Sequence, residues 1–273
     1  MTTTLGWIWS QGSLSVSPHL ITALATCCPP ESVKGLYSFI GTCSQLVDPL
    51  ESSLADLQSH NHIKWDDSLH QKFITKQDAL NSQKSIVLPR ASDQLWIVTD
   101  GSVTQCSLGV TLYVTCQDRL LFAGFCSSKL RKHQVTWLPC EVVALSIAAA
   151  VKHFSPFIIQ SKHRACVLTD SQPCVQALHK LCQGEFSASP RVTSFLTMVS
   201  RYQVSLQHLA GTANLPSDFA SCNAPDCNET NCQICSFVHE SVFSCTWHLH
   251  LRSPRQHQVP TLHQQTCMVQ CSK

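Results

Sequence analysis

The sequence predicts an α/β fold in which helices flank a five-stranded mixed sheet. Three strand-like segments follow one another at residues 95–99, 108–115 and 120–126, and two more, at 166–169 and 204–208, alternate with helix-like segments. Strands joined by short turns pair antiparallel, whereas parallel strands need a long crossover, usually a helix. One chain with both kinds of connection is therefore expected to form a mixed sheet.

The connections in this region have recognisable signals. Residues 116–119, Cys-Gln-Asp-Arg, are expected to form the turn of a hairpin. Pro139 predicts the start of a helix that runs to about His153, because proline is tolerated in the first helical turn. Two further helices are expected at residues 172–182 and 190–201.

A smaller α+β region is expected before this sheet. Residues 5–18 alternate apolar and small side chains around Gly12, which predicts a short hairpin. Pro29 and Pro30 precede a helix-like start at 31–34, and a second helix is predicted after Trp65.

Composition limits the compartment and the partners. The net charge is only +2, so any contact with nucleic acid must come from local patches. The longest nearly apolar run, residues 142–151, is about half of a membrane span. No secretory signal is visible, and the 17 cysteines are too sparse for a small disulfide scaffold. We expect an intracellular, cytoplasmic or nuclear chain that is not secreted, has no membrane partner, and carries free or metal-bound thiols.

Four acidic residues are the main candidates for chemistry. Asp100 and Asp170 each end an apolar run with Thr-Asp, and Glu141 and Asp218 lie at or near predicted helix starts. Each has an ordinary explanation: Asp100 in a turn, Glu141 favoured by the helix dipole, and Asp170 and Asp218 as helix N-caps. Taken together, however, carboxylates that converge from several elements suit Mg²⁺ or Mn²⁺. A pair of such ions can clamp the attacking and leaving oxygens of a phosphodiester.

The order Asp–Glu–Asp–Asp, with these flanking residues, resembles the ribonuclease H domain of reverse transcriptases from gypsy-like long-terminal-repeat retrotransposons. This resemblance covers about residues 95–221. A looser resemblance to the palm end, thumb and connection of the same enzymes covers residues 5–90, through residues 5–8, residues 36–41, and Trp65 followed by Phe73.

The resemblance implies a division of the chain and an activity. It implies a palm-end, thumb and connection-like region at 1–90 and a ribonuclease H-like domain at 91–221, with a cysteine-rich segment at 222–238 and a disordered tail at 239–273. The implied enzyme is an endoribonuclease that cuts the RNA strand of RNA–DNA hybrids, as a fragment of a retroelement polyprotein. In it Asp100 would bridge two metal ions and Asp170 would anchor them, with Glu141 on one ion and Asp218 on the other.

Two other functions stay open. The paired aspartates of the polymerase are absent, so the chain is not expected to polymerise DNA. It could then be an inactive remnant, or a module reused for nucleic-acid binding. A 3′–5′ exonuclease of the same fold is disfavoured because Ser102 stands where that enzyme needs an acid.

Candidate nucleic-acid contacts are Lys129, Arg131, Lys132 and Asn214. Residues 129–133 form one basic cluster and residues 162–164 form a second. Either cluster could equally be a solvated loop without a contact to nucleic acid. His208 is expected to be a structural or surface histidine.

Four cysteines, Cys222, Cys227, Cys232 and Cys235, are spaced as Cys-x4-Cys-x4-Cys-x2-Cys. Thiolates at such close spacing suit tetrahedral Zn²⁺, and the alternative is a cysteine-rich loop without metal. The segment has few apolar residues, so it is expected to need the metal to become ordered. The tail after residue 238 is rich in His, Gln and Ser and lacks periodicity, which indicates disorder.

Overall fold

The computed structural model describes residues 2–4, 7–10, 13–16, 26–33, 35–36, 39, 63, 65–82, 87–116, 119–185, 188–227 and 232–241. No helix within these ranges is both long and apolar enough to cross a membrane. The tail from residue 242 onward, predicted to be disordered, lies outside the described residues.

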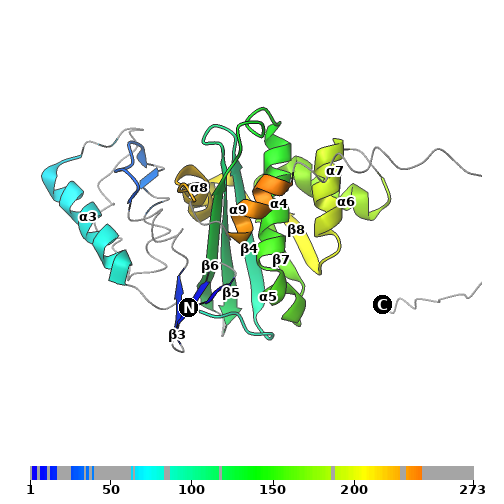
Figure 1. The fold of residues 1–273 in the computed structure, drawn as a ribbon, viewed down its shortest axis with the longest axis horizontal. Coiled ribbons are helices and arrows are strands. Elements are labelled where there is room, and N and C mark those ends of the chain that lie inside the picture. The colour runs from blue at the N-terminus through cyan, green and yellow to red at the C-terminus, as the bar shows by residue number, and fades with distance from the viewer. Residues whose placement is uncertain are drawn as a thin grey trace, which may run out of the picture.

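The centre of the molecule is a five-stranded mixed sheet with the strand order β6-β5-β4-β7-β8 (Figure 1). Its strands are β4 (Gln94–Ser102), β5 (Ser107–Cys116), β6 (Arg119–Lys129), β7 (Ala165–Thr169) and β8 (Val204–His208). The first three pair antiparallel, and β7 runs parallel to β4 and to β8. The predicted fold class is confirmed.

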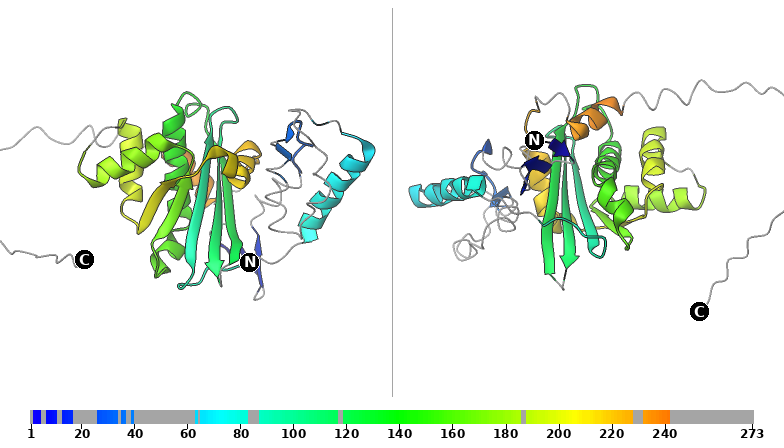
Figure 2. Two further views of the ribbon diagram at one scale, coloured as in Figure 1. Left: turned by 180° about the vertical axis from the view of Figure 1, so that it is seen from behind. Right: turned by 60° about the horizontal axis from the view of Figure 1, so that its bottom comes forward.

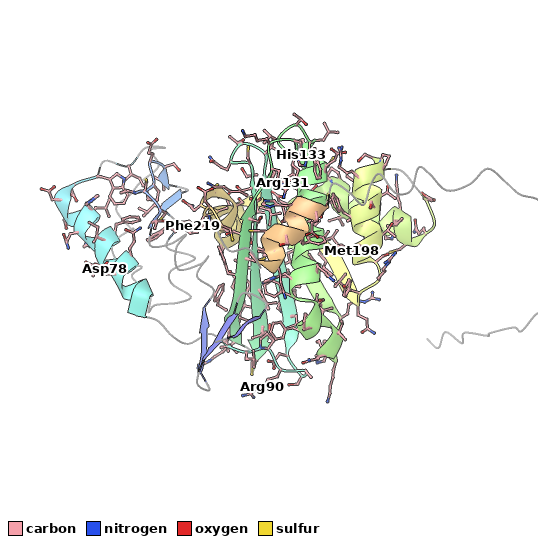
Figure 3. All side chains as sticks on the ribbon, in the orientation of Figure 1. Asp78, Arg90, Arg131, His133, Met198 and Phe219 are labelled. Carbon is pink, nitrogen blue, oxygen red and sulfur yellow. The ribbon has the colours of Figure 1, made fainter. Side chains whose placement is uncertain are left out.

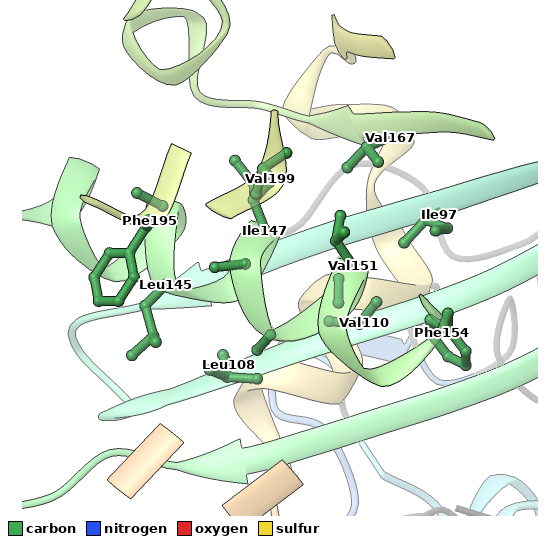
Figure 4. Close-up of a cluster of buried hydrophobic side chains, with 14 of the residues drawn as sticks. Ile97, Leu108, Val110, Leu145, Ile147, Val151, Phe154, Val167, Phe195 and Val199 are labelled. Atoms are coloured by element: carbon green, nitrogen blue, oxygen red, sulfur yellow. The ribbon is translucent and has the colours of Figure 1, made fainter. Parts of the chain in front are cut away.

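Helices cover one face of this sheet. They are α4 (Pro139–His153), α5 (Ser155–Gln160), α6 (Gln172–Cys182) and α7 (Pro190–Val199), with α6 and α7 stacked outside α4 (Figure 2). Side chains of α4 such as Leu145 and Val151 share one buried cluster with Ile97 of β4 and Val110 of β5 (Figure 4). The alanines at 148–150 have no exposed surface and let α4 approach the sheet closely.

The opposite face of the sheet is covered by α8 (Leu215–Cys222), which follows the short 3-10 helix η2 (Gly211–Ala213). Phe219 of α8 packs with Val98 and Phe125 of the sheet. Gly109 makes this contact possible, because a Cβ at that position would collide with the backbone nitrogen of Ser221. The backbone of α8 therefore rests directly on β5.

The region before the sheet contacts the same face. Helix α3 (Asp67–Ser82) carries Phe73, whose ring lies 4.6 Å from that of Phe39, and Phe39 lies 5.8 Å from Phe219. A small antiparallel sheet is formed by β1 (Thr2–Thr4), β2 (Trp7–Ser10) and β3 (Ser13–Val16). The pairing of β2 with β3 confirms the predicted hairpin. Most of the thumb-like segment, residues 40–62, lies outside the described residues.

A last helix, α9 (Gln233–Glu240), corrects one expectation from the sequence. Ile234, Cys235 and Val238 are buried in the same cluster as α4, and the side-chain amide of Gln134 donates to the carbonyl oxygen of Val238 at 2.8 Å. The expectation that this segment has too few apolar residues to become ordered is therefore wrong. Likewise His239 and Glu240, assigned to the tail, end α9. The chain division at residue 221 stays a prediction.

Candidate active site and cysteine cluster

Asp100 and Asp170 lie at the same end of two neighbouring parallel strands. Thr99 of β4 is in register with Thr169 of β7, so the two aspartates directly follow paired residues. Hydrogen-bonded strands are about 4.8 Å apart, so the two backbones are close at this edge. Asp170 is exposed and Asp100 is half-buried.

Helix α8 is tied to this edge by side-chain hydrogen bonds. The amide of Asn214 donates to the carbonyl oxygen of Thr99 at 3.2 Å, and the hydroxyl of Ser217 donates to that of Val98 at 2.9 Å. The hydroxyl of Ser221 bonds the carboxylate of Asp100 and also donates to the carbonyl oxygen of Asp218 at 3.0 Å. Asp218 lies in the first turn of α8, three residues before Ser221.

Glu141 reaches a different set of partners. It is the third residue of α4, only 5% exposed, and it accepts from the backbone N–H of Leu138 at 3.2 Å. Its Oε1 also accepts from the hydroxyl of Ser189 at 3.0 Å, and its Oε2 from Nη1 of Arg191 at 2.9 Å. These bonds satisfy a carboxylate that would otherwise be costly to bury.

The four carboxylates do not converge as expected. In the part of the chain that the structure describes, three cysteines form the only group of three or more candidate ligands whose atoms lie within 4.8 Å of one another. The physical reason is local: Glu141 is held by α7, while Ser221 holds the Asp100 carboxylate toward α8. Convergence within a few Å is therefore wrong for this arrangement. Asp100, Asp170 and Asp218 share one end of the sheet all the same.

The candidate nucleic-acid contacts separate into two kinds. Arg131 and Lys132 are exposed in the loop after β6. Figure 3 shows Arg131 at the sheet end opposite Arg90. The register places Ser102, Ser107 and Lys129 in one row across β4, β5 and β6, so this loop and Asp100 share an end. Asn214 is only 1% exposed and its amide holds β4. Its contact with nucleic acid stays a prediction.

The second basic cluster, residues 162–164, and His208 are exposed at the surface. Residues 162–164 precede β7 and are exposed at the Arg90 end, where the N–H of Lys162 bonds the carbonyl oxygen of Ala91 at 2.8 Å. His208 is the exposed last residue of β8, in register with Thr169.

The structure brings together three of the four predicted zinc ligands. The sulfurs of Cys227, Cys232 and Cys235 lie within 4.8 Å of one another, whereas Cys222, exposed at the end of α8, is outside the group. A hydrogen bond with Cys232 and burial both raise the pKa of the Cys235 thiol. Burial also raises the pKa of Cys126 on β6, and the neighbouring Cys232 adds to that effect.

Several residues with a clear role at the site were not predicted. Ser221, Ser189 and Arg191 bind the predicted carboxylates directly. Ser189 had a usable signal, because a serine just before a helical proline is a typical N-cap, and here it accepts from the N–H of Val192 at 3.3 Å. Arg191 and Ser221 had none, since their partners come from segments far away in the sequence.

The sequence of this domain matches a known family. Residues 65–165 fit the family model described as an RNase H-like domain found in reverse transcriptase. Residues 65–165 are therefore similar to this family. The matched part includes Asp100 and Glu141 and ends before Asp170 and Asp218. The mixed sheet with flanking helices is the fold that this family is expected to have. No curated protein matches the chain significantly in sequence.

Solved structures of protease-reverse transcriptases and of an RNase H1 are similar at low identity. The foamy viral protease-reverse transcriptase in complex with RNA/DNA hybrid is 17% identical, with a TM-score of 0.39 over 85% of this chain and 31% of that chain. Native prototype foamy virus protease-reverse transcriptase is 14% identical, with a TM-score of 0.44 over 75% of this chain and 28% of that chain. RNase H1 of Halobacterium salinarum NRC-1 is 12% identical, with a TM-score of 0.38 over 48% of this chain and 96% of that chain. The chain thus spans less than half of the foamy viral chains it resembles, and similarity at this level does not bear on function.

Proposed function

We propose that the RNase H-like domain is a metal-dependent endonuclease that cuts the RNA strand of RNA–DNA hybrids, within a retroelement polyprotein. The observation that carries the proposal is the register of Thr99 with Thr169. It sets Asp100 and Asp170 on neighbouring strands at one end of the sheet, and Ser221, three residues after Asp218 on α8, bonds the carboxylate of Asp100. Acids gathered at the carboxyl ends of parallel strands are a common basis for a ligand site.

The residues at this edge fit a divalent cation of the Mg²⁺ type. Carboxylate oxygens are the ligands that such ions prefer, and Asp170 is open to solvent. Asp100, Asp170 and Asp218 would hold the metal. When bound, it would supply the positive charge that activates a water and stabilises the developing charge on the phosphate. In the arrangement described here, Glu141 would join only after its carboxylate leaves Arg191.

The protein itself supplies position. Ser221 orients the carboxylate of Asp100, and Asn214 and Ser217 hold the start of α8 against β4. Arg131 and Lys132 are exposed at the same end of the sheet and would contact the phosphates of a bound hybrid. Selectivity for RNA would come from the 2′-hydroxyls in the minor groove.

The test is a cleavage assay of the full chain on labelled RNA–DNA hybrid with Mg²⁺ or Mn²⁺. We expect the RNA strand to be cut and duplex DNA to stay intact. Asp170→Asn should abolish cutting and keep the fold, because it removes charge, little volume and no buried contact. Equal cutting by wild type and by this variant would identify a contaminant and contradict the proposal.

A second function is favoured by one observation. Glu141 is fully bonded by Leu138, Ser189 and Arg191, as a structural carboxylate is. In that case the domain would bind nucleic acid without cutting it, as a remnant of a retroelement or a reused module. A well-folded chain that binds hybrid but leaves its RNA strand intact with either metal would favour this function over the first.

A further inference from the structure

The cysteine cluster borders a cavity that none of the four carboxylates lines. Cys227 and Cys235 line a cavity of about 570 Å³, together with the loop after β6, Asp226 and His239. Cys227, Cys232 and Cys235 do not form disulfides with one another. Three elements therefore meet there: the segment after α8, helix α9, and the basic loop.

The three sulfurs are already close to a metal-binding arrangement. In a tetrahedral zinc site with Zn–S distances of about 2.3 Å, two sulfurs are about 3.8 Å apart. Here all three lie within 4.8 Å of one another, so a contraction of about 1 Å per pair is enough. Soft thiolates select Zn²⁺ over the hard cations that suit a carboxylate site.

The fourth ligand has two candidates besides Cys222. His239 is four residues after Cys235 on α9, so the two side chains lie on the same helical face, and both line the cavity. Cys126 of β6 is near Cys232 but is only 3% exposed and lies outside the group of three close sulfurs. Asp226 lines it too, but its carboxylate pairs with Nζ of Lys129 at 2.8 Å.

The ring of His239 already has a partner for one of its two nitrogens. Its Nε2 lies 3.3 Å from the carbonyl oxygen of Lys129. A proton on Nε2 would be donated to that oxygen, which leaves the lone pair on Nδ1 for a metal. Histidine ligands commonly use their second nitrogen in this way.

We propose that Cys227, Cys232, Cys235 and His239 form a structural Zn²⁺ site that fixes α9 and the loop after β6 to each other. The hydroxyl of Ser128 already donates to Sγ of Cys235 at 3.5 Å, so the site is continuous with the end of β6. Rotation of the His239 side chain toward the sulfurs completes it. The site does not depend on the proposed nuclease, because it shares none of the four carboxylates.

The experiment measures zinc bound per full-length chain, by native mass spectrometry and elemental analysis. Cys232→Ser is the ligand variant, and Cys222→Ser is the matched control because its thiol is exposed and outside the group. His239→Ala and Cys126→Ala test the fourth ligand, with circular dichroism to check each fold. Substitution with Co²⁺ adds a second readout, since its d–d absorption reports how many sulfurs bind the metal.

We expect one zinc per wild-type chain, one in Cys222→Ser and in Cys126→Ala, and almost none in Cys232→Ser. His239→Ala should bind zinc at least about tenfold more weakly, and Co²⁺ should give the spectrum of three sulfurs and one nitrogen. A wild type that binds no zinc, even after zinc is added, overturns the site. Unchanged affinity in His239→Ala, or loss of zinc in Cys222→Ser or in a folded Cys126→Ala, overturns the fourth ligand.

Discussion

The guanidinium of Arg191 lies 2.9 Å from the carboxylate of Glu141, and the same guanidinium lies 4.5 Å from the centre of the Trp137 ring. The pair joins the first turn of α7 to the first turn of α4. The side chain of Arg191 is 40% exposed and the side chain of Glu141 only 7%, so the carboxylate depends on its partner more than the arginine does. The contribution of the Glu141–Arg191 pair to stability can therefore be measured separately from any role of Glu141 in catalysis.

Arg191→Met should lower the free energy of unfolding by about 1–2 kcal/mol, because it leaves a nearly buried carboxylate without its charged partner. A double-mutant cycle with Glu141→Gln, followed by chemical denaturation, should give a coupling energy of about 1 kcal/mol. The exposed Arg201→Met is the control and should change stability little. A coupling energy of zero would mean that the pair does not form in solution.

Gly109→Ala should displace α8. The new Cβ would meet the backbone of Ser221 and would come within 2.5 Å of the carbonyl oxygen of Ser217. Such overpacking costs about 1–3 kcal/mol, and we expect a loss of this size in thermal or chemical unfolding. Gly211→Ala is the matched control, because the nearest atom to its Cβ would be an ordinary 3.7 Å away. Equal stability of the two variants would contradict the close contact between α8 and β5.

Ile234→Ala tests whether α9 belongs to the core of the domain. Ile234 is 6% exposed within the cluster that contains α4, so its truncation should cost about 2–4 kcal/mol. Gln233→Ala, at the neighbouring exposed position, should cost almost nothing. The same cost for both variants would mean that α9 is not packed on the domain.

How far the sequence predicts this molecule depends on the range of the interactions. The bounds of α4, α6 and β8 are the predicted ones, because proline, apolar periodicity and β-branched runs act locally. Helices α5 and α9 were missed because both are short. Residues 155–160 directly follow α4, whereas residues 233–240 pack on α4 from far away in the sequence. The common edge of Asp100 and Asp170 followed from strand direction. The orientation of the Glu141 side chain toward Arg191 could not be predicted, because it depends on how α7 packs against α4.

The positions of the two basic clusters lead to a last prediction about nucleic acid. Arg131 and Lys132 stand at the end of the sheet where Asp100 and Asp170 lie, whereas Lys162 and Arg164 stand at the other end. Strand β7 separates residue 164 from Asp170 by about 16 Å or more. A hybrid centred on the acids would reach the first cluster more easily than the second.

We therefore expect the double variant Arg131→Gln, Lys132→Gln to weaken binding of an RNA–DNA hybrid and to flatten its dependence on salt. Each phosphate contact that is lost should reduce the slope of log K against log salt by about 0.7–0.9. The double variant Lys162→Gln, Arg164→Gln is the matched control, with the same loss of charge, and should keep the slope of the wild type. Fluorescence anisotropy of a labelled hybrid over a series of salt concentrations measures both. If the control variant lost as much slope as the first, binding would follow net charge alone, and the hybrid would not be centred on the acidic end of the sheet.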